Sequence, residues 1–358
     1  MINDAFIEFD SQIHSLLNQC YTNRIFYEHI KELNKKGIDN KTDKEKEYLK
    51  LFSTHYSDIK RLDYVSKVIF LYGIFEQFIE NCIKEYVVEL VEIVDSFDDL
   101  EIKVQDDYYK LWRDLMGKLE WAKYEDLNES IMIKNLYHTK CENSPNILYQ
   151  CFLRNGGNYN HKKVIETINA LVGRDSIKNL PQYDPLRRYF IQHNMDKIDE
   201  NGKYKLLDDL VMYRNEIAHN GVPDSMLSDN KFREMVHYVL KYAKSLISLL
   251  SDELMYVRWK KLQDKSQILR PTNTWKRQFI ASFEAPNIML EQNELIMVRN
   301  NRMYPQYKYV SIDEIRIKLQ DGNIKTVDYI AEDGNTIFSI KTNVYLSKSN
   351  EFLFEKFE

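Results

Sequence analysis

Helical periodicity that continues for tens of residues, almost without glycine or proline, is the feature that most limits how this chain can fold. Apolar residues recur at helical spacing from 4 to 33, from Lys44 to Val94 and from Ser228 to Asp264. The second stretch allows a break near Ser53-Thr54. The whole chain of 358 residues has 10 glycines and 7 prolines. We therefore expect a mostly α fold built as an antiparallel helical bundle.

The character of the sequence changes at Arg270-Pro271. Asp321-Gly322 and Asp333-Gly334 are dipeptides that favour two-residue hairpin turns between strands. The β-type runs are Gln278 to Phe283, Glu294 to Arg299, Glu314 to Leu319, Ile324 to Ile330 and Thr336 to Ile340. We expect a helical domain at residues 1–268 and a small antiparallel β domain at 269–358.

Residues 96–204 have a less regular pattern and are expected to form a helical insertion within the first domain. Gln105 to Tyr137 is expected to be helical, with Trp112, Leu115 and Trp121 among its buried residues. The insertion could help to select a substrate, or it could only add packing around the bundle.

A cluster of polar residues ends the helix predicted from Leu207 onwards. Asn220-Gly221 followed by Pro223 is a strong stop signal, so Arg214, Asn215 and His219 lie in the last turns of that helix. Asn215 and His219 are four residues apart and share a face, and the long Arg214 side chain can reach the same region. The simpler explanation is that histidine interacts with the helix dipole and arginine is solvated.

The segment resembles the signature of the HEPN superfamily, in which an Arg, a polar residue that is often Asn, a short spacer and a His end a late helix. Arg214, Asn215 and His219 match that signature residue by residue. The stretch from Tyr64 to Ile83 resembles the early core helix of the larger bacterial HEPN proteins, where a polar residue faces the Arg and His. Glu76 is the candidate for that residue; its alternative role is a surface charge on the helix flank.

The resemblance implies a metal-independent RNA endonuclease that needs no cofactor. The ribose 2′-hydroxyl attacks the neighbouring phosphate and leaves 2′,3′-cyclic phosphate and 5′-hydroxyl ends. His219 is suited to proton exchange near neutral pH, Arg214 to the charge on the phosphate oxygens, and Asn215 to positioning. Arg214, Asn215, His219 and Glu76 are thus the expected catalytic residues.

One motif supplies one imidazole, whereas transfer is helped by a base and an acid together. We therefore expect a homodimer with a composite active site. The resemblance further implies a toxin or an antiviral defence effector that acts on tRNA or single-stranded RNA, with an antitoxin or regulatory protein as a further partner. The alternative is a non-catalytic HEPN module that binds a nucleotide or a protein.

The charge of the chain limits how it could bind nucleic acid. A formal net charge of −5 argues against non-specific coating, because such binding rests on many contacts from Lys and Arg to phosphate. An RNA substrate therefore requires local positive charge. Four basic pairs could supply it or could be solvated surface: Lys162-Lys163, Arg187-Arg188, Lys260-Lys261 and Lys276-Arg277.

Cysteine usage and the N-terminal residues bear on the compartment. Cys20, Cys82, Cys141 and Cys151 form no C-x-x-C pair, so free buried thiols are expected rather than zinc ligands or disulfides. The first residues lack a signal peptide pattern, and the longest apolar run, Val68 to Phe75, is too short to span a membrane. We expect a cytoplasmic protein with no membrane contact.

A metal-dependent nuclease in the β domain is a competing hypothesis. Such sites combine acidic residues and a lysine on adjacent strands to hold a divalent cation. Asp328, Glu332 and Lys341 are present, but the residues just before Lys341 lack the required acid.

Overall fold

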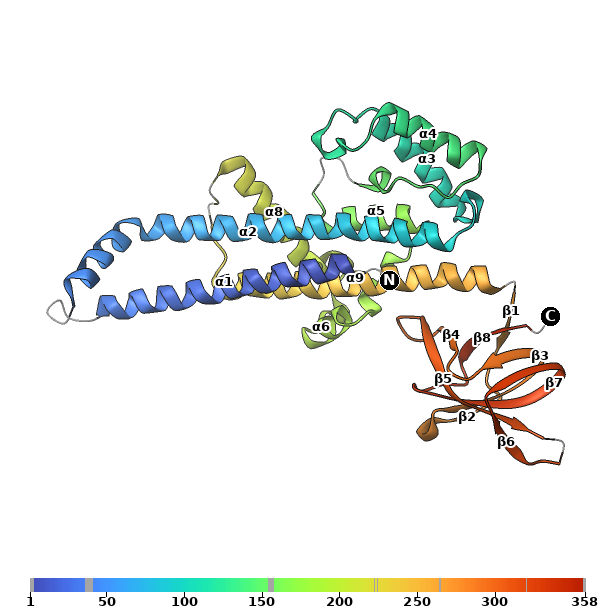
Figure 1. Cartoon of the computed structure of the whole chain (residues 1–358). Helices are drawn as coiled ribbons and strands as arrows, with labels where there is room; N and C mark the ends of the chain where they lie inside the picture. Colours follow the sequence, from blue (N-terminus) through green and yellow to red (C-terminus); the bar gives the residue numbers. More distant parts are fainter. Residues whose placement is uncertain are drawn as a thin grey trace. The chain divides into compact units, whose positions relative to one another are not determined.

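The structure is a computed structural model that describes residues 3–35, 41–153, 158–221, 223, 225–263, 265–319 and 321–356. A mostly helical region is followed by an antiparallel β half-barrel, as expected (Figure 1). The chain divides into two compact units. The first contains Met1–Val87, Glu101–Tyr137 and Ile147–Ile247, and the second contains Val88–Leu100, His138–Asn146 and Ser248–Glu358.

The helical elements follow the periodicity of the sequence. In chain order the α-helices are α1 (Asp4–Lys35), α2 (Asp43–Ile93), α3 (Ile102–Met116), α4 (Glu129–Cys141), α5 (His161–Val172), α6 (Leu186–Gln192), α7 (Glu200–Lys203), α8 (Lys205–Asn220) and α9 (Asp229–Gln263). The short 3-10 turns are η2 (Phe97–Asp99), η3 (Ala122–Tyr124), η4 (Tyr149–Phe152), η5 (Ile177–Gln182), η6 (Met195–Lys197) and η7 (Lys276–Gln278).

Helix α2 is continuous, so the break allowed near Ser53-Thr54 does not occur. The hydroxyls of Ser53 and Thr54 donate to the carbonyl oxygen of Lys50 at 3.1 Å and 2.9 Å. Serine and threonine can bond the preceding turn in this way and remain inside a helix. The two residues therefore mark no boundary.

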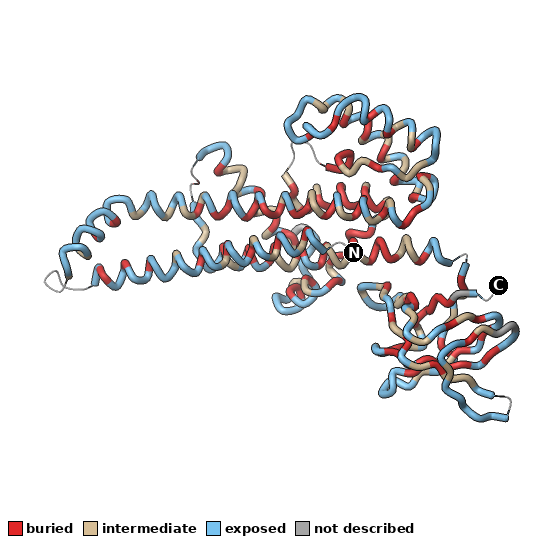
Figure 2. Tube along the Cα trace, in the orientation of Figure 1, coloured by how far each residue is buried: buried red, intermediate tan, exposed pale blue. Residues whose placement is uncertain are grey.

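Aromatic side chains join α1, α2 and α9 in the core of the first unit. The rings of Phe9 on α1 and Phe78 on α2 have centroids 4.6 Å apart, and Phe75 meets Tyr242 of α9 at 6.0 Å. All four side chains are buried, as the red bands along these helices show (Figure 2). Burying one phenylalanine contributes about 1.5–3 kcal/mol, so these contacts fix the early core helix on which Glu76 lies.

Within the insertion, the stretch expected to form one helix contains parts of two α-helices. Gln105 to Tyr137 divides into α3, the turn η3 and α4, because α3 ends at Gly117 and the backbone then forms 3-10 turns. Trp112 and Leu115 are buried as expected, but Trp121 is 45% exposed. Trp121 lies in the turn rather than on a helix face, so its expected burial is wrong.

The second unit contains the β half-barrel. Its strands are β1 (Ser266–Leu269), β2 (Asn273–Trp275), β3 (Ile280–Glu291), β4 (Leu295–Asn300), β5 (Tyr307–Lys318), β6 (Ile324–Val327), β7 (Tyr329–Thr342) and β8 (Asn350–Glu355). They pair antiparallel in the order β1-β8-β4-β5-β7-β3-β2, and β6 pairs with β5. Its core includes Phe283, Ile315, Phe338 and Phe352, each at most 1% exposed.

The hairpin expected at Asp333-Gly334 is wrong, because both residues lie inside β7. The pairing register of β3 shifts between Pro286 and Ile288, opposite this segment. Asn287 at the shift has φ 48°, and its side-chain oxygen accepts a hydrogen bond from the backbone N–H of Gly334 at 3.1 Å. The turn at Asp321-Gly322 does lie between β5 and β6, with φ 85° at Gly322.

The expected domain boundary between residues 268 and 269 stays a prediction, and it falls within β1.

No helix among the described residues is long and apolar enough to cross a membrane.

Candidate active site

Helix α8 positions the expected catalytic residues near its C-terminus. Leu207, Leu210, Val211 and Ile217 form its buried face. The backbone N–H of Gly221 donates to the carbonyl oxygen of Ile217 at 2.8 Å and closes the last turn. As a result, Arg214 and Asn215 are half-buried, whereas His219 in the last turn is exposed.

The side-chain amide of Asn215 is oriented by two neighbours. Its carbonyl oxygen accepts from Arg214 Nη1 at 3.2 Å and from Asn158 Nδ2 at 2.5 Å. Because a guanidinium can only donate, the atom that faces Arg214 must be the oxygen of the amide. Among the described residues the NH2 group of Asn215 has no acceptor, so it can donate to a further ligand.

Tyr72 of α2 links Arg214 to Glu76. The Arg214 guanidinium carbon lies 5.1 Å from the centroid of the Tyr72 ring, within the range of a cation–π interaction. The Tyr72 hydroxyl accepts from the backbone N–H of Tyr159 at 3.1 Å and hydrogen-bonds to the Glu76 carboxylate. Burial raises the pKa of Tyr72 to about 12, so its hydroxyl keeps its proton and can donate.

Glu76 is half-buried on α2. Burial raises the pKa of its carboxyl group, and the negative charge of Glu80 adds to this, while Lys123 and Arg214 lower it. Glu80 itself forms an ion pair with Lys123. The expected direct partnership between Glu76 and Arg214 is absent from the ion pairs of the described residues, because Tyr72 connects the two groups instead.

The site thus unites three of the four predicted residues through short contacts and leaves His219 apart. Within the described part of the chain, His219 has no hydrogen-bond or ion-pair partner, and its imidazole faces solvent. Whether these four residues are catalytic stays a prediction. Tyr72, Asn158 and Tyr159 are contributors that the sequence did not single out, although an aromatic ring four residues before Glu76 was a visible signal.

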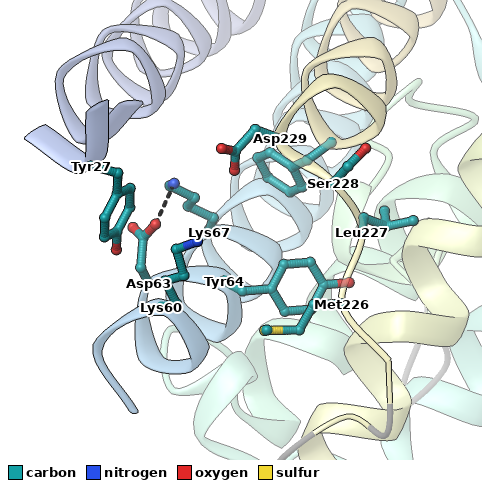
Figure 3. Close-up of a pocket in the computed structure, with 10 residues that line it drawn as sticks. Tyr27, Lys60, Asp63, Tyr64, Lys67, Met226, Leu227, Ser228 and Asp229 are labelled. Carbon is teal, nitrogen blue, oxygen red and sulfur yellow. Dashed lines mark hydrogen bonds and ion pairs between the residues drawn. The ribbon is translucent and has the colours of Figure 1, made fainter. Parts of the chain in front are cut away.

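A pocket near α8 does not contain the motif. It measures about 310 Å³ and is bounded by residues of α1, α2, α9 and the segment that precedes α9 (Figure 3). Lys67 and Asp63 form a buried ion pair of 2.5 Å in its wall, and Tyr27 and Tyr64 flank them. Arg214, Asn215 and His219 are not among its lining residues; Arg214 and Asn215 are half-buried, and His219 is exposed.

Nothing in the described residues brings three metal-binding side chains together. Of the competing metal-site hypothesis, Asp328 lies just before β7 and Lys341 near its other end, and the strand between them, at about 3.3 Å per residue, separates them beyond the reach of one ion. Cys20, Cys82 and Cys151 are buried free thiols, as expected, but Cys141 is exposed.

Most of the basic pairs are occupied by other contacts. In three pairs, one residue forms an ion pair with an acid: Lys163 with Glu166, Arg188 with Asp184 and Lys261 with Asp95. Lys276 of the fourth pair instead lies 5.4 Å from the ring centroid of Tyr345. Lys276-Arg277 is therefore the pair whose positive charge is least compensated among the described contacts.

Comparison with known proteins identifies the family of this chain. No curated protein sequence matches it. A family model described as RiboL-PSP-HEPN does match residues 58–252, which include α8, α5 and most of α2. This match covers more than half of the chain, so the protein belongs to the RiboL-PSP-HEPN family of the HEPN superfamily.

Proposed function

We propose that the protein is an RNA endonuclease that leaves 2′,3′-cyclic phosphate and 5′-hydroxyl ends. HEPN domains are typically ribonucleases. The observation that carries the proposal is the arrangement of Arg214, Asn215 and an exposed His219 at one helix end, supported by Tyr72 and Asn158. The cluster places a permanent cation, an oriented amide and a titratable ring on a surface that a polymer can reach.

Each residue has a distinct role in this reaction. The ribose 2′-oxygen bonds to phosphorus, its proton passes to an imidazole, and the bond from phosphorus to the 5′-oxygen breaks as that oxygen receives a proton. Arg214 stabilises the charge on the non-bridging oxygens, and the NH2 group of Asn215 donates to the same phosphate. Glu76 acts at a distance, because it holds Tyr72 beneath the guanidinium.

A second copy of the chain completes the site. One His219 cannot both accept the first proton and donate the second in a single concerted step. Because His219 is exposed at the end of α8, two α8 ends can meet across a two-fold axis and form one cleft. The second His219 then supplies the acid.

The biological role fits an enzyme that must be restrained. We place it among toxins or antiviral defence effectors, with tRNA or single-stranded RNA as substrate and an antitoxin or regulatory protein as the restraining partner. Expression in a bacterial host is expected to be toxic for the wild type and tolerated for His219→Ala.

The decisive experiment is cleavage of total tRNA and of a single-stranded RNA in EDTA, read on denaturing gels with the product ends mapped. The wild type should cut and leave cyclic phosphates, and His219→Ala should not. His29→Ala is the matched control, because His29 is also exposed on a helix of the same unit. Cleavage that survives in His219→Ala would refute the assignment of the site.

Co-expression tests the composite cleft. When wild-type and His219→Ala chains with different tags are produced together, mixed dimers should form. The activity per wild-type chain should then fall as the variant chain becomes more abundant. Constant activity per wild-type chain would show that one copy is sufficient. If neither protein cuts RNA while a nucleotide or a protein binds at Arg214, the non-catalytic alternative is favoured.

A further inference from the structure

One end of the β half-barrel carries an exposed group of aromatic and basic side chains, which we call the aromatic-basic end: Trp275, Lys276, Arg277, Phe279 and Tyr345. The three rings are 43%, 41% and 42% exposed. Both basic residues are also exposed. Large rings usually lie inside a fold, so their gathering at one exposed edge calls for a physical reason.

The backbone brings these residues together from two segments. Strand β2 ends at Trp275, the turn η7 carries Lys276 and Arg277, and Trp275 pairs with Ile280 at the start of β3. The backbone N–H of Thr342 donates to the carbonyl oxygen of Phe279 at 3.0 Å. This bond holds the end of β7, and with it the segment that contains Tyr345, against the turn.

Phe279 has a strained backbone. Its φ is 55°, in the left-handed region that bulky residues rarely adopt. Such strain lowers stability and persists where the surroundings or a function impose it. Burial of the ring does not repay the strain here, because the ring is exposed. The conformation instead keeps the ring outside, next to Lys276 and Arg277.

The charge of this end differs from that of the whole chain. Residues 271–283 and 335–350 contain no Asp or Glu, yet they contain Lys276, Arg277, Lys341 and Lys348. The chain as a whole is at −5. Two acids of β5 lie opposite the end of β7: Asp313 at the register shift between Ile312 and Glu314, and Glu314 itself, which is hydrogen-bonded to Arg316 at 2.6 Å. Among the residues that the structure describes, neither Lys276 nor Arg277 forms an ion pair with an acid.

Exposed rings interleaved with cations match single-stranded nucleic acid in particular. Bases stack on aromatic rings, and the phosphates between them bind Lys and Arg. A helical duplex keeps its bases stacked on each other and would not use the rings. An apolar protein partner would need the exposed rings, but it would not require a surface that lacks Asp and Glu. Charge complementarity therefore selects a polyanion with exposed bases.

We propose that the aromatic-basic end binds single-stranded RNA, with bases stacked on Trp275 and Tyr345 and phosphates held by Lys276 and Arg277. The inference rests on the proposed function for the choice of RNA over DNA. In this proposal the β half-barrel binds the single-stranded RNA that the helical unit cleaves.

The test is fluorescence anisotropy with a labelled single-stranded RNA of about 20 nucleotides, in EDTA, using the full chain with His219→Ala so that the probe stays intact. Trp275→Ala and Tyr345→Ala should each weaken binding about tenfold. The double change Lys276→Gln with Arg277→Gln should reduce the steepness of the salt dependence by about 1.4 in log–log slope. Double-stranded RNA should show no loss on removal of the rings.

Matched controls lie elsewhere on the same half-barrel. Tyr329 is 52% exposed and Lys325 is exposed on β6, and Tyr329→Ala and Lys325→Gln should bind as the parent does. Full affinity in the Trp275 and Tyr345 variants would overturn the proposal, as would a loss shared equally by the control variants. A loss limited to the charge variants would mean simple electrostatic attraction and would also overturn it.

Cleavage of a dinucleotide separates this inference from the proposed function. If neither the dinucleotide nor the long RNA is cut by the protein with an intact His219, while the ring variants still lose RNA binding, the chemistry is wrong and the binding surface stands. If the dinucleotide is cut in a His219-dependent way while the ring variants bind normally, only the binding surface is wrong.

Discussion

Helices α5 and α8 of the first unit each combine a histidine with a glycine after the helix, but His161 begins α5 whereas His219 lies in the last turn of α8. Each contains a histidine, and each is followed by a glycine with positive φ, 76° at Gly173 and 72° at Gly221. His161 is 8% exposed, and its ring stacks on Tyr204 with centroids 3.3 Å apart, whereas His219 is exposed. The same residue types thus lie in a packed environment on one helix and at an exposed end on the other.

Burial decides what each imidazole can do. The ring of His161 lies 3.1 Å, through Nδ1, from the hydroxyl of Tyr242, and its backbone N–H donates to Asp208 at 3.0 Å. Desolvation lowers the pKa of His161 to about 3, so the ring stays neutral and acts as a packing element. The ring of His219 on α8 is exposed instead, so a substrate can contact it.

The largest expected effect is a difference in the rate of RNA cleavage between variants of His219 and of His161. His219→Ala should lower the rate of RNA cleavage about 10²- to 10⁴-fold or more, because a positioned acid or base contributes that much. His161→Gln should keep most of the rate at neutral pH. Initial rates on a labelled RNA measure both, with thermal unfolding midpoints to confirm that each variant folds. Equal losses of cleavage rate in the two variants would contradict the different roles assigned to His219 and His161.

The next effect concerns the glycine at the end of α5. A Cβ at position 173 would lie 2.6 Å from Val104 Cγ2 and 2.8 Å from Glu101 Cβ, and φ 76° is unfavourable for alanine. Strain and overpacking together should cost about 2–4 kcal/mol in the free energy of unfolding for Gly173→Ala. Urea unfolding followed by circular dichroism measures it. A loss well under 1 kcal/mol would show that α3 and α5 separate easily.

Local signals on α8 allowed the helix and its polar end to be predicted. Asn220-Gly221 fixes where the helix stops, and the spacing of Arg214, Asn215 and His219 then sets their positions within one or two turns. Asn158 could not be predicted as a partner, because it lies 57 residues before Asn215 and meets it only through the fold.

The β half-barrel shows the same limit. Strands β1 and β2 have 4 and 3 residues, too few to display alternation, and both were missed together with β8. The Asp333-Gly334 dipeptide has the chemistry of a turn, but pairing with β3 across Asn287 keeps it extended. Long-range pairing overrode the local preference there.

A smaller effect is the pH dependence that His161 contributes. An unfolded histidine titrates near 6.5, whereas folded His161 has a pKa of about 3, so below pH 6.5 the unfolded chain binds a proton that the folded chain does not. The free energy of unfolding therefore falls as the pH drops from 6.5 towards 3 and is unaffected above that range. At pH 5 the loss should be about 2 kcal/mol.

Urea titrations at pH 7 and pH 5 measure this contribution as a difference between proteins. His161→Gln cannot titrate and should lose less stability over that interval than the wild type. His29→Gln removes an exposed histidine and should behave as the wild type does. Parallel pH profiles for wild type and His161→Gln would contradict a buried, neutral His161.

The smallest effect completes the pair of glycines. A Cβ at position 221 would meet nothing within 4 Å, so only the positive φ opposes an alanine there. Gly221→Ala should cost about 1 kcal/mol in stability, less than Gly173→Ala, because backbone strain acts without steric overlap. The same change should alter cleavage more than Gly173→Ala does, since relaxation of the last turn of α8 moves His219. Both variants should be measured for unfolding and for cleavage. We expect the larger loss of stability in Gly173→Ala and the larger loss of cleavage in Gly221→Ala. A Gly221→Ala protein that cuts at the full rate would show that His219 tolerates a shift of its turn.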